Sequence, residues 1–247
     1  MAEPLLPSVP NFRDIGGLAT TGGARVRHGM LFRSSALHTA SPHDTTRLYG
    51  EFGIRTVIDL RATEEVTANP AEIPTTARHL LVQMSKETTF AYQAWLREGA
   101  TEAFDVVSGY RRFLDNAAVA IVGAYRELGN DAALPAVVHC TFGKDRTGVV
   151  IAVLLALLGV PEQMIAADYA KSESAIPATI SALDGGADPT ARLAELPEWS
   201  VRTRTESMAD LLAVLRTQHG GAAAWAERAG LTVGELDALR DRLLQPT

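Results

Sequence analysis

The chain has 247 residues, a mass of 26.4 kDa and a formal net charge of −6, and 47% of its residues are hydrophobic. This composition is typical of a globular protein and excludes a disordered or fibrous chain, while the negative charge argues against a nucleic-acid partner. One cysteine cannot form an internal disulfide, and without a recognisable signal or a bilayer-length apolar run we expect a cytoplasmic protein with no stable membrane insertion.

The first half of the chain alternates short β-rich segments with helical ones, which is typical of an α/β sheet with crossover connections. Strands are predicted at residues 30–33, 55–60 and 78–82. Between the first two strands, Ser41 is a helix N-cap and Pro42 takes the first helical position. The predicted helix continues to about Phe52 and ends at Gly53.

The middle of the chain, from about residue 88 to 128, has a helical composition with hydrophobic residues three and four positions apart. We interpret this stripe as core packing rather than as a cofactor site. Its members are Tyr92, Trp95, Leu96, Phe104, Val107, Tyr110, Phe113 and Leu114. A short apolar strand at residues 135–139 then places Cys140 at its C-terminal end, where ligands bind in an open α/β sheet.

The remaining third of the chain is mainly helical. A hydrophobic helix is predicted at residues 146–158, Gly159 ends it, and Pro161 begins the next helix. Prolines and a glycine pair interrupt residues 172–205, which makes this segment a candidate for a mobile cover. Helices at 206–218, 222–229 and 232–244 complete the chain, and Thr232 and Glu235 fit a capping box.

Together these elements predict one α/β domain over residues 1–247, with a central, mostly parallel sheet flanked by helices and a helical C-terminal elaboration. Within that domain, residues 162–205 are a candidate helical cover or lid segment.

The most informative segment is residues 139–148, which read His-Cys-Thr-Phe-Gly-Lys-Asp-Arg-Thr-Gly and place Arg146 six positions after the only cysteine. A cysteine attacks as its thiolate, and because a thiol at neutral pH is mostly protonated, the site must supply positive potential. If residues 141–146 curl over one point, their backbone N–H groups and the N-terminus of the following helix supply it. The same field would hold a phosphate dianion, and the Arg146 guanidinium would bind two of its oxygens.

A lone cysteine is more often a small buried hydrophobic residue. That alternative gives no reason for His, Gly, Lys and Arg to gather around it. The pattern therefore indicates a phosphate-binding loop built around a nucleophilic thiolate.

Residues 139–148 resemble the active-site loop of the cysteine-dependent protein tyrosine phosphatase superfamily. Residues 11–17 (Asn-Phe-Arg-Asp-Ile-Gly-Gly), 31–34 (Leu-Phe-Arg-Ser) and 53–61 resemble its bacterial atypical branch, whose members also act on phosphoinositides. Relatives carry helices in the C-terminal third that cover the active site. The resemblance implies a tyrosine-phosphatase-like fold and hydrolysis of phosphate monoesters through a phosphocysteine intermediate, with no metal and no other cofactor.

The resemblance also implies roles for individual residues. Cys140 would be the nucleophile, Arg146 the phosphate clamp and Thr147 a hydroxyl partner of the sulfur. Substrate-binding positions of the loop would be Thr141, Phe142, Gly143, Lys144 and Thr147. His139 is expected to shape the loop rather than to exchange protons.

The general acid has a different location here, because the separate Trp-Pro-Asp loop that carries it elsewhere in the superfamily is absent. The bacterial branch has an aspartate inside the loop, at the position of Asp145, so Asp145 is assigned the proton. Asp59, at the end of a predicted strand, is the fallback acid or a substrate-positioning group. Alternatively, its carboxylate is paired with one of three nearby arginines: Arg13, Arg33 or Arg61.

The expected substrates are phosphotyrosine in proteins and, beyond it, phosphoserine, phosphothreonine or phosphoinositides, with phosphate or another oxyanion in the active site. Lys144 matches a lysine of tensin-type lipid phosphatases and suits a substrate with several phosphates. Thr141, where the tensin-type loop has another lysine, argues against a strong inositide preference. Two alternatives stay open: a phospholigand-binding module without catalysis, and a thiol redox enzyme, for which a second cysteine is missing.

Overall fold

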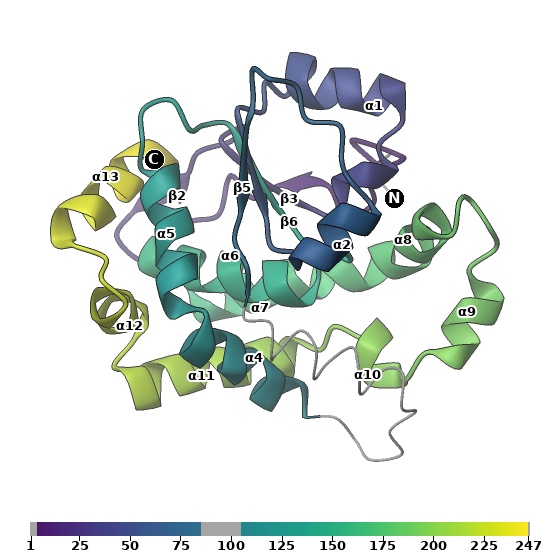
Figure 1. The fold of residues 1–247 in the computed structure, drawn as a ribbon. Helices are drawn as coiled ribbons and strands as arrows, with labels where there is room; N and C mark the ends of the chain where they lie inside the picture. The colour runs from purple at the N-terminus through teal and green to yellow at the C-terminus, as the bar shows by residue number, and fades with distance from the viewer. Residues whose placement is uncertain (1–3, 85–104, 247) are drawn as a thin grey trace.

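The central element is a five-stranded sheet with the strand order β1-β3-β6-β4-β5, seen in a computed structural model that describes residues 4–84 and 105–246 (Figure 1). The strands are β1 (Arg13–Asp14), β3 (Leu31–Ser34), β4 (Thr56–Asp59), β5 (Arg78–Leu81) and β6 (Ala136–His139). β3, β6, β4 and β5 run parallel, and only β1 pairs antiparallel, with β3. The predicted mostly parallel α/β sheet is confirmed.

Each of the three inner strands faces two different hydrophobic cores, because successive side chains of a strand point to opposite faces. Leu31, Ile58 and Val138 pack into the larger core, and their chain neighbours Phe32, Val57 and Val137 pack into the smaller one. The smaller core is closed by the N-terminal segment and the helix after β3. In it, the rings of Phe12 and Phe32 stack at 5.1 Å.

The helices of the first half agree with the prediction in part. Ser41 caps α1 (Pro42–Thr46) by accepting a hydrogen bond from the Asp44 amide at 3.1 Å, and the π-helix η2 (Arg47–Glu51) continues it to Phe52. The predicted helical region up to residue 128 divides at Ala117 into α4 (Val106–Asn116) and α5 (Ala118–Leu128). Its expected members Tyr92, Trp95, Leu96 and Phe104 lie outside the described residues.

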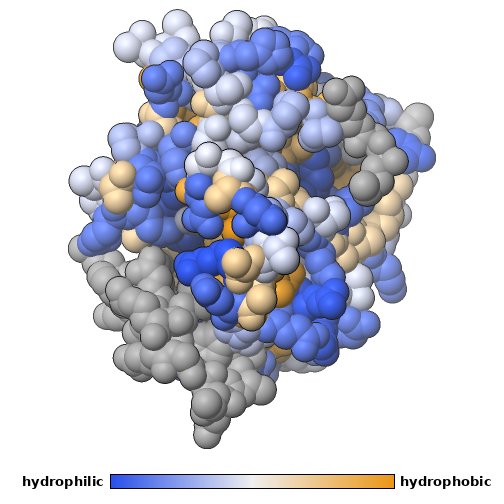
Figure 2. All heavy atoms as spheres, turned by 90° about the vertical axis from the view of Figure 1, so that its right-hand side faces the viewer, coloured by the Kyte–Doolittle hydropathy of each residue, from blue (hydrophilic) through white to orange (hydrophobic). Residues whose placement is uncertain are grey.

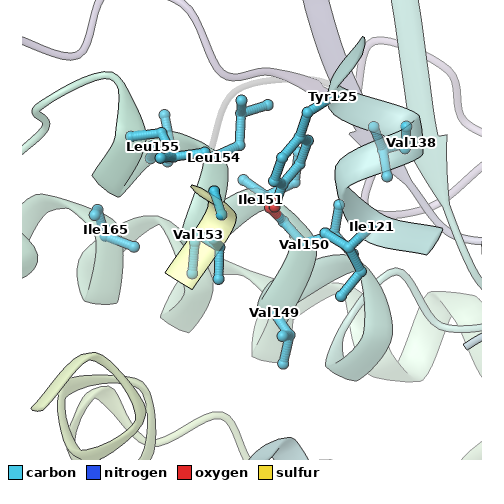
Figure 3. Close-up of a cluster of buried hydrophobic side chains, with 14 of the residues drawn as sticks. Ile121, Tyr125, Val138, Val149, Val150, Ile151, Val153, Leu154, Leu155 and Ile165 are labelled. Atoms are coloured by element: carbon cyan, nitrogen blue, oxygen red, sulfur yellow. The ribbon is translucent and has the colours of Figure 1, made fainter. Parts of the chain in front are cut away.

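The larger core is built around α6 (Asp145–Leu157), which is buried on nearly all sides as its apolar sequence predicts. Figure 3 shows Val149, Ile151 and Leu155 of this helix among side chains of α5 and of α7 (Glu162–Ala170). The helices α11 (Thr205–His219), α12 (Ala222–Arg228) and α13 (Val233–Leu243) complete the layer. The predicted capping box is present: Thr232 and Glu235 each accept a hydrogen bond from the other's amide.

The short strand β1 was not predicted, and neither were two further strands and one helix. β2 (Ala24–Val26) pairs antiparallel with β7 (Leu244–Pro246), and α2 (Thr63–Ala68) follows β4. The strands are too short to give an alternating pattern, and α2 buries no residue, so it has no hydrophobic stripe.

The segment at residues 172–205 is more helical than its prolines suggest. It contains η3 (Lys171–Ala175), α8 (Ile176–Leu183), α9 (Thr190–Glu195) and α10 (Glu198–Val201). The prolines lie at the starts of these helices, where the missing N–H costs nothing. Figure 2, which views the molecule from the side of α8 and α9, shows a mostly hydrophilic surface with small hydrophobic patches.

The preceding helix α7 buries Ile165 and Tyr169 in the larger core, so only the chain after it is exposed enough to act as a cover. That role and the single-domain organisation stay predictions. Among the described residues, no helix combines the length and the apolar character needed to cross a bilayer.

Candidate active site

The site forms where three parallel strands end together. His139, the last residue of β6, pairs with Ser34 of β3 and with Asp59 of β4. Cys140 follows directly, residues 141–144 form a loop, and α6 begins at Asp145. The predicted order of strand, cysteine, loop and helix is present, and the Cys140 thiol is unpaired and 3% exposed.

The carbonyl groups of the loop are bonded away from its centre. The amides of Ala36 and Gly148 and the side chains of Asn11 and Arg33 supply the donors. The bonds are Ala36 N to Thr141 O at 3.0 Å, Asn11 Nδ2 to Phe142 O at 3.1 Å and to Gly143 O at 3.0 Å, Arg33 to Gly143 O at 2.8 Å, and Gly148 N to Lys144 O at 2.8 Å. These hydrogen bonds to its backbone carbonyl oxygens fix the position of the loop.

Unlike the carbonyl groups, the amide groups of the loop are not hydrogen-bonded to any residue that the structure describes. Within residues 4–84 and 105–246, the N–H groups of residues 141–145 have no hydrogen-bond acceptor. Donors left without a partner beside a helix N-terminus favour an anion. This is the arrangement expected of an oxyanion cradle.

Gly143 is required by the close approach of the loop to β3. Its φ is +66°, and a Cβ atom on it would lie 2.2 Å from the carbonyl oxygen of Ser34. No side chain fits in that space, so the glycine sets how tightly the loop packs on the sheet.

A buried charge network lies behind the loop. Asp168 of α7 accepts hydrogen bonds from Arg33 at 2.7 Å and from Arg13 at 3.0 Å, and Arg33 also holds the loop at Gly143. Arg33 is 1% and Asp168 3% exposed. Burial alone would raise the pKa of Asp168, but the two guanidinium groups lower it to about 2.

Asn11, in the segment 11–17 that carries part of the resemblance, packs against the loop: its side chain donates to two loop carbonyls, and its φ is 63°. Asp168 was not identified at all, because a lone aspartate in a helix carries no signal of its partners.

Arg146 is held by Glu65 of α2, a residue that sequence analysis missed. The guanidinium binds both carboxylate oxygens, at 2.6 and 3.0 Å, and Glu65 also accepts from the Thr141 hydroxyl at 2.6 Å. Burial raises the pKa of Glu65, but Arg146 and the other donors lower it to about 2. The Arg146 guanidinium is therefore oriented beside the loop by a fixed negative charge.

Asp145 and Lys144 lie together at the start of α6. The Tyr110 hydroxyl donates to Asp145 Oδ1 at 2.5 Å, and Lys144 Nζ lies 3.3 Å from the same oxygen. Lys144 is 1% exposed and donates to the carbonyls of Trp199 and Ser200 in α10, at 3.1 and 2.9 Å. The lysine thus connects the loop to the segment considered as its cover.

Asp59 forms the arginine pair that was the alternative to a role as acid or substrate-positioning group. Its carboxylate is fully buried and forms a bidentate pair with Arg61, at 3.0 and 2.8 Å, with His79 and His139 beside it. Burial would raise the pKa of Asp59, but the neighbouring His139, His79 and Arg61 hold it far below its usual range. Of the three arginines considered, Arg61 is the partner.

Two other loop neighbours have defined positions. His139 is buried, and burial lowers its pKa to about 4, so the ring is neutral; its Nδ1 lies 3.3 Å from the carbonyl oxygen of Cys140. Thr147 is also buried, but its hydroxyl has no hydrogen-bond partner among the described residues, so the expected bond to the sulfur of Cys140 is not made. Phe142 is half-buried. In the part of the chain that the structure describes, no three His, Cys, Asp or Glu side chains are grouped to hold a metal ion.

Comparison with known proteins finds a matching family and several similar proteins. A family model described as the tyrosine phosphatase family matches residues 4–245. An inferred tyrosine-protein phosphatase of Cupriavidus necator is 35% identical over 171 residues, 67% of this chain and 61% of that relative, so the chain spans about three fifths of its length. The triple specificity protein phosphatase PtpB of Mycobacterium tuberculosis is 28% identical over 288 aligned positions, covering 99% of this chain and 100% of that protein.

Among solved structures, the core catalytic domain of the PP-IP phosphatase SIW14 from S. cerevisiae in complex with citrate is similar, with a TM-score of 0.37 and 18% identity. It covers 66% of this chain and 85% of that one.

Proposed function

Because the chain belongs to the tyrosine phosphatase family, we propose that it hydrolyses phosphate monoesters, with phosphotyrosine in proteins as its main substrate. The observation that carries the proposal is the loop at residues 141–145, whose carbonyls are tied to the scaffold while its amides remain available to an oxyanion. Donors fixed before substrate binds stabilise developing charge without reorganisation.

In the first step, the Cys140 thiolate attacks phosphorus in line with the leaving oxygen. The S–P bond forms as the P–O bond to the leaving group breaks, and the protonated Asp145 carboxyl gives its proton to the departing oxygen. Arg146 binds two equatorial phosphate oxygens and follows their charge into the transition state.

In the second step, the Asp145 carboxylate takes a proton from a water molecule, whose oxygen attacks the phosphocysteine. The S–P bond breaks, inorganic phosphate forms, and the thiolate of Cys140 and the acid form of Asp145 are restored. This cycle needs no cofactor, and a reducing cytoplasm would keep the thiol in its active form.

Glu65 supports the role proposed for Arg146. The bidentate pair with Glu65 holds the guanidinium in one plane, and this is the plane in which Arg146 would meet the phosphate.

Substrate choice depends on Lys144. A second phosphate, as in a phosphoinositide, would need the ammonium group that now binds the carbonyls of Trp199 and Ser200, so such substrates require α10 to move. One relative is named for triple specificity, which supports testing several substrate classes.

The decisive experiment compares phosphate release from a phosphotyrosine peptide, a phosphoserine peptide and a phosphoinositide. We expect wild-type protein to release phosphate, Cys140→Ser to be inactive, and Arg146→Ala to lose about a thousandfold or more in kcat/KM. Equal turnover by wild type and Cys140→Ser would remove Cys140 from the mechanism. Tight phosphopeptide binding without phosphate release would instead identify a binding module.

A further inference from the structure

Two buried tyrosines, Tyr110 of α4 and Tyr169 of α7, meet at the first turn of α6 beside Asp145. Their exposed fractions are 2% and 1%, and their rings pack edge to face with centroids 6.2 Å apart. The two hydroxyl oxygens are 2.6 Å apart, and Tyr110 lies 2.5 Å from Asp145 Oδ1. A continuous row of hydrogen bonds therefore leads from the helix α7 to the assigned acid.

The chemistry of the groups sets the direction of this row. The Tyr110 hydroxyl donates to Asp145 Oδ1, so its proton points to that oxygen. The Tyr110 oxygen is then the acceptor for the Tyr169 hydroxyl. Burial raises the pKa of both tyrosines well above the usual range, so both remain protonated donors.

The position of Tyr169 is fixed by its surroundings. A Cβ atom at Gly148 would lie 2.9 Å from Tyr169 Cδ2, so the ring rests directly on the helix that carries Asp145. The preceding residue, Asp168, is the buried partner of Arg33, which also holds the loop. The two tyrosines are therefore held by the same helices and the same buried arginine that hold the phosphate-binding loop.

Two donor groups lie within hydrogen-bond or ion-pair distance of Asp145 Oδ1. This oxygen faces the Tyr110 hydroxyl and the Lys144 ammonium group, both of which are donors. A proton on the carboxyl group is therefore favoured on the other oxygen, Oδ2.

We propose that Tyr110 is a positioning residue for the general acid: it holds Asp145 Oδ1 so that Oδ2 carries the transferable proton, and Tyr169 keeps the Tyr110 hydroxyl in the donating orientation. The inference rests on the proposed function. In the acid step the proton leaves Oδ2 for the departing oxygen, and in the hydrolytic step Oδ2 takes a proton from water. The Tyr110 proton stays on its own oxygen throughout.

The test is Tyr110→Phe, which removes only the hydroxyl, assayed on aryl phosphates whose leaving groups differ in basicity. Protonation matters most for basic leaving groups, so we expect a loss of about tenfold in kcat for the poorest leaving group and little change for the best. Tyr169→Phe, which keeps the bond to Asp145, should show the same pattern with a smaller loss.

Tyr125→Phe is the matched control. Tyr125 is also buried and also donates to α6, at the Val150 carbonyl 2.7 Å away, but it does not contact Asp145. We expect this variant to keep the wild-type dependence on the leaving group.

A double variant, Tyr110→Phe with Asp145→Asn, should lose no more activity than Asp145→Asn alone, because Tyr110 acts only through that residue. Equal losses across the whole substrate series, additive losses in the double variant, or the same effect from Tyr125→Phe would overturn the inference. Failure of the proposed function looks different: wild type and Cys140→Ser would then give the same turnover with every substrate.

Discussion

Gly143→Ala tests how closely the cradle must pack on the sheet. The new Cβ would lie 2.2 Å from the Ser34 carbonyl oxygen, whereas ordinary contact begins at 3.4 Å, so the loop or β3 must move by about 1.2 Å. An alanine at a φ of +66° adds about 1 kcal/mol of backbone strain, and the overpacking adds about 1–3 kcal/mol. Since a displacement of about 1 Å at reacting groups costs about a hundredfold in rate, we expect kcat/KM to fall by that factor.

Gly53→Ala is the control for this prediction. Gly53 has nearly the same φ, 63°, but nothing lies within 4 Å of its Cβ position. Thermal unfolding and hydrolysis of an aryl phosphate are measured for both variants, and Gly53→Ala should lose only the strain energy and keep its activity. If the two variants match in stability and in kcat/KM, close packing of the loop does not shape the cradle.

Three further predictions concern the supports of the loop. Glu65→Gln should lower kcat/KM about tenfold, because Arg146 keeps its charge but loses a charge-assisted bidentate partner; unchanged kinetics would refute this. His139 is neutral in the folded state down to about pH 4, whereas it protonates near pH 6.5 when unfolded. The unfolded state therefore binds more protons between pH 4 and 6.5, so stability falls as the pH is lowered through that window, by at most about 3 kcal/mol from this group. Urea unfolding at several pH values should show a flatter profile for His139→Gln, and an identical slope would contradict the assignment. Asn11→Ala should weaken binding of vanadate about tenfold, since Phe142 O loses its side-chain donor and Gly143 O loses one of its two donors, and Asn11→Gly should do the same without the strain at φ 63°. Tight vanadate binding by the glycine variant would exclude a role for the side chain.

Much of the sheet could be predicted from the sequence, because its inner strands are short runs of β-branched and hydrophobic residues next to glycine or proline. The long hydrophobic helix α6 was equally clear. The two- and three-residue strands β1, β2 and β7 could not be found, since pairing with distant segments, rather than any local pattern, makes them strands. The polar helix α2 is similar: it is identified by its place after β4, not by a hydrophobic face.

The chemistry of the loop was readable because its residues are contiguous. The residues that hold the loop and its side chains in place could not be identified from the sequence. Glu65, Asp168 and Tyr110 are distant from the loop in sequence and are common residue types. The partner of Asp59 illustrates the limit, because three arginines were equally acceptable in sequence and only the folded chain selects Arg61. The family resemblance implied a hydrogen bond from the Thr147 hydroxyl to the Cys140 sulfur, but the structure, which describes both residues, shows no such bond.

The buried carboxylate of Asp168 has a consequence for where this protein can be shortened. A fragment that ended after α6 would keep every residue of the phosphate loop, but two guanidinium groups, those of Arg13 and Arg33, would have lost their shared counterion. Removing one member of a buried ion pair costs about 3–5 kcal/mol, a large part of the stability of a domain. The smallest piece able to fold around this loop therefore extends at least through α7, whereas trimming from the far end of the chain toward that helix disturbs the loop less directly.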